Sequence, residues 1–125
     1  MFVSIHLDSS ASKSVHGSSV YYYKNYSAPL ADAISKNLPE TIKADTGYKL
    51  TDRGFHFYPF KVTRIENCPA VLVECGFISN TNAIYTPPSD AKSKANCDFK
   101  FLNSSLGQKT VAKGIYKGIL EYLGT

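Results

Sequence analysis

Two short segments near the amino terminus have the residue pattern of β-strands. In residues 2–7, apolar side chains alternate with Ser4 and His6, which is the two-residue period of a strand with one buried face. Residues 20–23 join a valine to three tyrosines, and β-branched and aromatic residues favour strands. The serine-rich residues 8–19 between them predict a loop.

A helix is predicted over residues 27–38, where buried-type side chains recur every four residues. These side chains are Leu30, Ile34 and Leu38. Ser27 is placed to cap this helix, and Pro29 is tolerated in its first turn. Pro39 is expected to end or kink the helix, because proline lacks a backbone N–H. The polar residues 46–54 are then expected to form a connection.

Two more strands and a loop are predicted in the second half. Residues 60–64 have a strand-like composition, and residues 70–74 run continuously apolar up to an acid. A continuous apolar run is typical of a central strand that is covered on both faces. Residues 86–103 contain a double proline and a polar, lysine-bearing run, and we expect a loop there.

A terminal helix is predicted by apolar side chains with helical spacing. They are Val111, Ile115, Ile119 and Tyr122. Lys109, Lys113 and Lys117 lie on a different face of this helix, and a solvated stripe is a better interpretation of them than a binding patch. Strands and helices in this order indicate an α/β layered fold.

Composition indicates one ordered domain and excludes several classes of protein. The chain has 125 residues, of which 43% are hydrophobic and 19% charged with mixed sign. No apolar run is long enough to cross a bilayer, and the amino terminus does not resemble a signal peptide, so any export signal is expected on sequence outside this chain. The net charge of +4 comes from dispersed lysines and does not predict nucleic-acid binding.

The three cysteines do not form a recognisable metal motif. Cys68, Cys75 and Cys97 are odd in number and lack a C-x-x-C spacing, which argues against a zinc knuckle. One disulfide with a spare thiol fits an oxidising compartment, and spacing alone does not choose the pair. Buried free thiols are favoured, above all for Cys75 within its apolar run.

His6 and Glu74 are the candidate site residues, because each interrupts or ends an apolar strand. Ligands of open α/β sheets bind beyond the carboxyl ends of the strands, so we expect both side chains to reach one site. An imidazole and a carboxylate there suit metal-assisted hydrolysis. A lone histidine on a strand is more often a hydrogen-bonded core or surface residue. A glutamate that ends a buried strand is less ordinary, because burying an unpaired carboxylate is costly.

The same segments resemble the zinc-dependent N-acetylmuramoyl-L-alanine amidases of bacterial cell-separation enzymes and phage endolysins. Residues 4–8, Ser-Ile-His-Leu-Asp, are similar to that family's Ser-Ile-His-Ala-Asn. Residues 69–74, Pro-Ala-Val-Leu-Val-Glu, match a family signature and continue as Cys-Gly-Phe-Ile-Ser-Asn. Residues 112–115 match the opening of the family's last helix. The resemblance covers nearly the whole chain.

The resemblance implies that residues 1–125 are a single, partial amidase catalytic domain. The implied fold is α/β, with a mostly parallel central sheet flanked by helices and incomplete at its amino-terminal side. The implied reaction cleaves the amide between N-acetylmuramic acid and L-alanine in peptidoglycan, outside the cytoplasm. Glu74 would act as general base and then acid, and His6 would bind Zn²⁺. Arg64 and Asp8 would position substrate, although a structural hydrogen bond explains each equally well.

The chain also departs from the family pattern. A complete family domain begins earlier, and that part carries a first His ligand and a Glu ligand that have no counterpart here. We do not expect His16 or His56 to replace them, so one of three zinc ligands is present. We therefore expect little or no hydrolysis by the chain alone, and either a complementing amino-terminal segment or self-association. The alternatives are a non-catalytic cell-wall-binding or regulatory module with this fold, and a zinc hydrolase of another amide.

Overall fold

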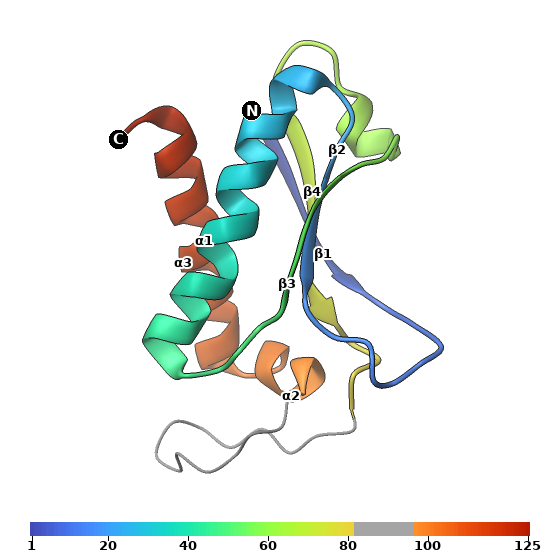
Figure 1. Cartoon of the computed structure of the whole chain (residues 1–125), viewed down its shortest axis with the longest axis vertical. Helices are drawn as coiled ribbons and strands as arrows, with labels where there is room; N and C mark the ends of the chain where they lie inside the picture. The colour runs from blue at the N-terminus through green and yellow to red at the C-terminus, as the bar shows by residue number, and fades with distance from the viewer. Residues whose placement is uncertain (82–96) are drawn as a thin grey trace.

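A mixed sheet of four strands carries two long helices on one face in the computed structural model, which describes residues 1–81 and 97–125 (Figure 1). The strands are β1 (Phe2–Asp8), β2 (Ser18–Tyr22), β3 (Asp52–Phe57) and β4 (Ala70–Phe77). Their spatial order is β1-β4-β2-β3. The β1–β4 and β2–β3 pairs are parallel and the β4–β2 pair is antiparallel, which confirms an α/β fold with a mostly parallel sheet.

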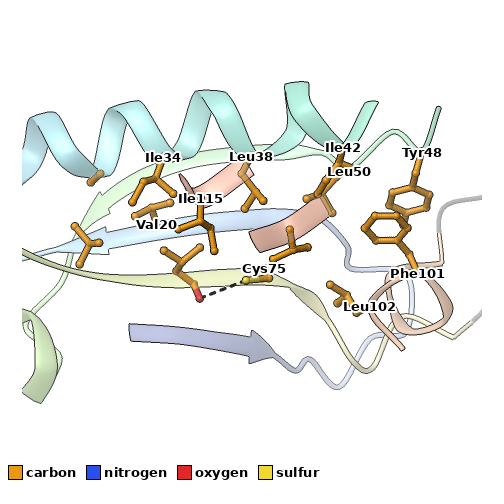
Figure 2. Close-up of a cluster of buried hydrophobic side chains, with 14 of the residues drawn as sticks. Val20, Ile34, Leu38, Ile42, Tyr48, Leu50, Cys75, Phe101, Leu102 and Ile115 are labelled. Atoms are coloured by element: carbon orange, nitrogen blue, oxygen red, sulfur yellow. Dashed lines mark hydrogen bonds between the residues drawn. The ribbon is translucent and has the colours of Figure 1, made fainter. Parts of the chain in front are cut away.

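The helices build the hydrophobic core against the sheet. They are α1 (Ala28–Thr46), α2 (Asp98–Leu102) and α3 (Ser105–Leu123), with the 3₁₀ turns η1 (Asn25–Ser27) and η2 (Lys61–Arg64). Figure 2 shows Leu38 of α1 and Ile115 of α3 above Val20 and Cys75 of the sheet. The periodic apolar stripes predicted for α1 and α3 are therefore confirmed as the faces that pack on the sheet.

Helix α1 is longer than predicted, because Pro39 neither ends nor visibly interrupts it. The helix continues to Thr46 and ends at Gly47, whose φ of 72° lies in the left-handed region that glycine adopts freely. Ile42 continues the four-residue stripe and is fully buried. Its packing in the core therefore offsets the loss of the backbone hydrogen bond that proline cannot donate. Ser27 is the N-cap residue of α1, as predicted, but its hydroxyl makes no cap hydrogen bond and instead accepts one from Ala70 N at 3.0 Å.

The third strand lies earlier in the chain than predicted. Residues 52–57 form β3, within and beyond the expected polar connection, whereas residues 60–64 form the turn η2 and not a strand. Gly54, with φ of 84°, sits where the β2–β3 register shifts, and this bulge breaks the alternation that sequence reading relies on. The hydroxyl of Thr63 donates to the carbonyls of Tyr58 and Phe60, which fixes the turn instead.

Part of the predicted loop at residues 86–103 is helical. Residues 98–102 form α2, where the prediction was wrong, and residues 86–96 lie outside the described part of the chain. Phe101 of α2 stacks on Tyr48 with ring centroids 4.4 Å apart, which attaches α2 to the core. A segment that looks polar in the sequence thus contributes a large aromatic side chain to the core.

The cysteines are free thiols in this structure. Cys68 is half-buried, and Cys75 and Cys97 are buried. Burial and the neighbouring Glu74 carboxylate raise the pKa of Cys75 to about 12, so it is a poor nucleophile near neutral pH. Among the described residues, no helix is both long and apolar enough to span a bilayer.

Candidate active site

The strand register places His6 beside Glu74. The two residues are Cα partners on the neighbouring parallel strands β1 and β4, and in-register partners project from the same face of a sheet. Val73 and Cys75 point into the helix-covered core, so Glu74 between them points to the opposite face. Ser19 of β2 is the partner of Glu74 on its other side. We call this surface, which carries His6, Ser19 and Glu74, the Glu74 face.

A β-bulge follows Glu74 directly. His6 pairs with Glu74 but Asp8 pairs with Phe77, so β4 contains one extra residue at this point. Gly76 lies within the bulge with φ of 146°, and a Cβ there would come within 3.1 Å of Asp98 Oδ2. Bulges of this kind redirect side chains and are enriched next to active sites. The glycine that follows the Val-Glu-Cys run is thus needed for the local geometry.

Glu74 is electrostatically unusual. Its Oε2 atom is buried and has no hydrogen-bond partner among the described residues. Burial raises the pKa of Glu74, the negative charge of Asp8 raises it further, and His6 opposes the shift. A carboxyl group whose pKa moves toward neutrality can both accept and return a proton.

Ser4 holds the His6 ring. Ser4 Oγ and His6 Nε2 lie 2.8 Å apart and share a hydrogen bond, whose donor depends on the imidazole tautomer. Because Nε2 is used by Ser4, Nδ1 is the ring nitrogen that remains for a ligand. Ser4 was missed as a site residue, although the two-residue period of β1 already placed it on the same face as His6.

Asp98 fixes the backbone next to the site through hydrogen bonds. It is fully buried, and its Oδ2 accepts hydrogen bonds from Gly17 N at 2.7 Å and Phe77 N at 3.0 Å. Its Oδ1 accepts one from the Tyr48 hydroxyl at 2.6 Å, and burial together with this carboxylate raises the pKa of Tyr48. The Asp98 side chain thereby links the residue before β2 to the last residue of β4. Sequence reasoning missed Asp98 because its segment was interpreted as a loop.

The two predicted substrate-positioning residues lie in different places. Asp8, at the end of β1, is close enough to influence the Glu74 pKa, and its Oδ1 accepts a hydrogen bond from Ser9 N. Arg64 is exposed at the end of η2, which Figure 1 shows near the amino end of β4. It is not among the charged groups that shift the Glu74 pKa. The substrate contact predicted for each residue stays a prediction.

The described residues do not form a complete zinc site. Catalytic zinc normally has three protein ligands and one open position. Within residues 1–81 and 97–125, no three His, Cys, Asp or Glu side chains are grouped so that they could hold a metal ion. Among the described residues, His6 therefore supplies one imidazole beside Glu74, and no group of three potential ligands includes it.

Comparison with known proteins identifies relatives of one kind. A family model described as N-acetylmuramoyl-L-alanine amidase matches residues 1–121. The probable cell wall amidase LytH of Staphylococcus saprophyticus is 39% identical over 79 residues, which cover 63% of this chain and 25% of LytH.

Solved structures agree with the sequence relatives. The catalytic domain of CwlV, an N-acetylmuramoyl-L-alanine amidase from Bacillus (Paenibacillus) polymyxa var. colistinus, is 35% identical with a TM-score of 0.73. The match covers 98% of this chain and 57% of that one. The amidase AmiC2 of Nostoc punctiforme is 29% identical with a TM-score of 0.78, over 99% of this chain and 58% of that one.

The matches thus cover just over half of these two solved chains and a quarter of the S. saprophyticus LytH. Within that span, the family match extends from the first residue to the end region of α3 and includes both His6 and Glu74. On this evidence, the chain belongs to the N-acetylmuramoyl-L-alanine amidase family.

Proposed function

We propose that this chain supplies the general base and one metal ligand of an amidase that cleaves peptidoglycan outside the cytoplasm. The bond broken is the amide between N-acetylmuramic acid and L-alanine of the stem peptide. The observation that carries the proposal is the position of Glu74 beside His6 on one sheet face, next to a bulge, with a buried Glu74 Oε2 that has no partner within residues 1–81 and 97–125. A purely structural glutamate at this position would be expected to have a hydrogen-bond partner.

Glu74 is the residue that moves the proton. A water molecule that attacks the amide carbon must lose a proton, and Glu74 Oε2 accepts it. The same atom then returns the proton to the nitrogen of L-alanine, which leaves as an amine. The raised pKa of Glu74 supports both steps, because it brings proton uptake and release nearer to neutral pH.

His6 is the metal ligand in this proposal. The family is generally zinc-dependent, and zinc held by His6 together with further ligands would polarise the carbonyl and make the attacking water more acidic. Ser4 orients the imidazole. The remaining ligands come from outside the described residues, next to β1, which is an edge strand of this sheet. That edge receives either a complementing segment or a second copy of the chain.

A chimeric enzyme tests the proposal. Residues 1–121 replace the matching part of the CwlV catalytic domain, so that the rest of CwlV supplies what this chain does not cover. We expect the chimera to release new L-alanine amino groups from purified peptidoglycan. Glu74→Gln should lower that rate by about a hundredfold or more, as for loss of a general base. The control Glu66→Gln changes a side chain that is 80% exposed and should leave the rate unchanged.

The opposite outcome is equally specific. A folded chimera that hydrolyses peptidoglycan at the same rate with Glu74→Gln would reject the assigned role of Glu74. An inactive chimera would instead favour a non-catalytic wall-binding module, provided that the chain alone binds peptidoglycan and that neither Glu74→Gln nor His6→Ala changes the binding. The chain alone is expected to show little turnover, because it holds one ligand.

A further inference from the structure

An aromatic cluster lies on the Glu74 face, and the proposed chemistry makes no use of it. We define the aromatic wall as Tyr21, His56, Tyr58 and Phe60. The Tyr21 ring lies at the centre, with centroid distances of 5.5 Å to His56, 6.3 Å to Tyr58 and 5.2 Å to Phe60. Tyr58 and Phe60 are 4.5 Å apart, so the four rings are contiguous.

The wall begins close to Glu74. Tyr21 is the strand partner of Leu72, while Ser19 is the partner of Glu74, so Tyr21 lies two residues along the same face. At the rise of a β-strand, this offset is about 7 Å. Tyr21 is also the partner of His56 on β3, which carries the wall outward from the site. The distance from a substrate bound at Glu74 to the aromatic wall is therefore about the length of one sugar ring.

The wall is not part of the hydrophobic core. The core lies on the other side of the sheet, where Tyr22 packs and contacts Phe57. Tyr58 is 52% exposed and His56 is exposed, while Tyr21 and Phe60 are half-buried. Exposed aromatic rings in contact with partly exposed ones form a contiguous patch, and such patches often mark binding surfaces.

The backbone at Tyr58 does not depend on its side chain. Its N–H donates to Tyr22 O at 2.8 Å, and its carbonyl accepts from Thr63 Oγ1 at 2.9 Å and Phe60 N at 3.0 Å. Backbone hydrogen bonds thus hold Tyr58 in place, while its ring remains largely exposed to solvent. A truncation at this position is expected to keep the fold.

We propose that the aromatic wall binds a pyranose ring of the glycan strand next to the scissile amide, an inference that rests on the proposed function. The C–H face of a pyranose is apolar and stacks on aromatic rings, while its hydroxyl groups remain hydrated. The acidic stem peptide would instead favour lysine or arginine side chains, and none of the four wall residues is a lysine or an arginine. The sugar is therefore the part of the substrate that this surface fits.

Binding of a peptide-free glycan tests the inference. The probe is the β-1,4-linked tetramer of N-acetylglucosamine, titrated into the ¹⁵N-labelled chain and followed by NMR. We expect shifts at Tyr21, His56 and Tyr58. Tyr58→Ala should weaken binding about threefold to tenfold, the range for loss of one aromatic stacking contact. Tyr58→Phe keeps the ring and should bind like the unaltered chain.

The matched control is Phe57→Ala. Phe57 is 59% exposed and adjacent in sequence, but it contacts Tyr22 and Tyr23 away from the wall, so its loss should leave glycan affinity unchanged. Equal weakening by Phe57→Ala and Tyr58→Ala would overturn the inference. So would unaltered binding by Tyr58→Ala, or a wall that responds to the free stem peptide and not to the tetramer.

The two proposals fail separately. Tetramer binding that depends on Tyr58, alongside a chimera in which Glu74→Gln changes nothing, would keep the wall and reject the catalytic assignment. Hydrolysis that depends on Glu74, alongside tetramer binding that ignores Tyr58, would keep the amidase role and reject the wall.

Discussion

At the scale of single residues, Glu74 is a carboxyl group whose surroundings disfavour its ionised form. Burial and the Asp8 charge both raise its pKa above the ordinary value of 4.5, and only His6 opposes them. The folded chain therefore binds a proton more tightly at Glu74 than the unfolded chain does. Its contribution to stability is fully present below pH 4.5 and is lost as the pH rises through the raised pKa.

Glu74→Gln should consequently stabilise the fold at neutral pH. We expect the free energy of unfolding at pH 7 to rise by about 0.5–2 kcal/mol, as is common when a strained functional group is removed. The difference from the unaltered chain should shrink toward pH 4, where Glu74 is protonated. Urea denaturation at both pH values measures this, with Glu66→Gln as the exposed control. A Glu74→Gln chain that is less stable at pH 7 would show that the carboxylate has a stabilising partner.

The sequence identified some site residues and concealed others for physical reasons. His6 and Glu74 were predictable because each is a polar side chain in an apolar strand. We expected them to be close because both were placed at the carboxyl ends of strands. In the structure they are close because they are register partners on β1 and β4, and Glu74 lies in the middle of β4. Asp98 was not predictable, because a buried acid satisfied by three donors looks like any surface aspartate in the sequence.

At the scale of elements, the approach of α3 to α1 depends on two glycines. A Cβ on Gly118 would lie 2.6 Å from Ile34 Cα, and one on Gly114 would lie 2.9 Å from Leu38 Cα. Both neighbouring atoms belong to the α1 backbone, which cannot turn aside as a flexible side chain can. The small residues one turn apart therefore set the distance between the two helices.

Gly118→Ala should destabilise the chain despite the better helix propensity of alanine. The propensity gain is about 1 kcal/mol, whereas overpacking against a backbone costs roughly 1–3 kcal/mol or more, so we expect a net loss. Gly114→Ala should have the same sign and a smaller size. Thermal unfolding measures both, with the exposed Lys117→Ala as a neighbouring control. An unchanged or raised melting temperature for Gly118→Ala would mean that the helices separate easily.

Elements with strong periodicity were predicted well, and elements set by tertiary contacts were not. The stripes of α1 and α3 and the apolar run of β4 are local signals, and the structure confirms them. Within the described part of the chain, strand β3 pairs only with β2 at the sheet edge, and its glycine bulge hides the alternation. Pro39 stays helical because Ile42 beyond it is buried, a fact that no local pattern reveals.

At the scale of the whole molecule, the sheet is covered unevenly. Helices α1 and α3 pack over one face, and β1 is an edge strand beside them (Figure 1). Val3 packs against the core, but Ile5 and Leu7, on the same side of β1, are 60% and 48% exposed. Apolar side chains on an edge strand with free backbone hydrogen-bonding groups favour association with another chain.

Ile5→Lys should therefore suppress self-association of this chain. We expect the unaltered chain to form dimers or larger species as its concentration rises, because pairing along β1 removes apolar surface from water. A lysine at this position adds a repelling charge at the paired edge, so the variant should remain monomeric at higher concentration in sedimentation velocity. Tyr116→Lys, at a 58% exposed position on α3, should associate like the unaltered chain. If Ile5→Lys associates just as strongly, the contact lies elsewhere than β1, and the edge is not where the sheet accepts a partner.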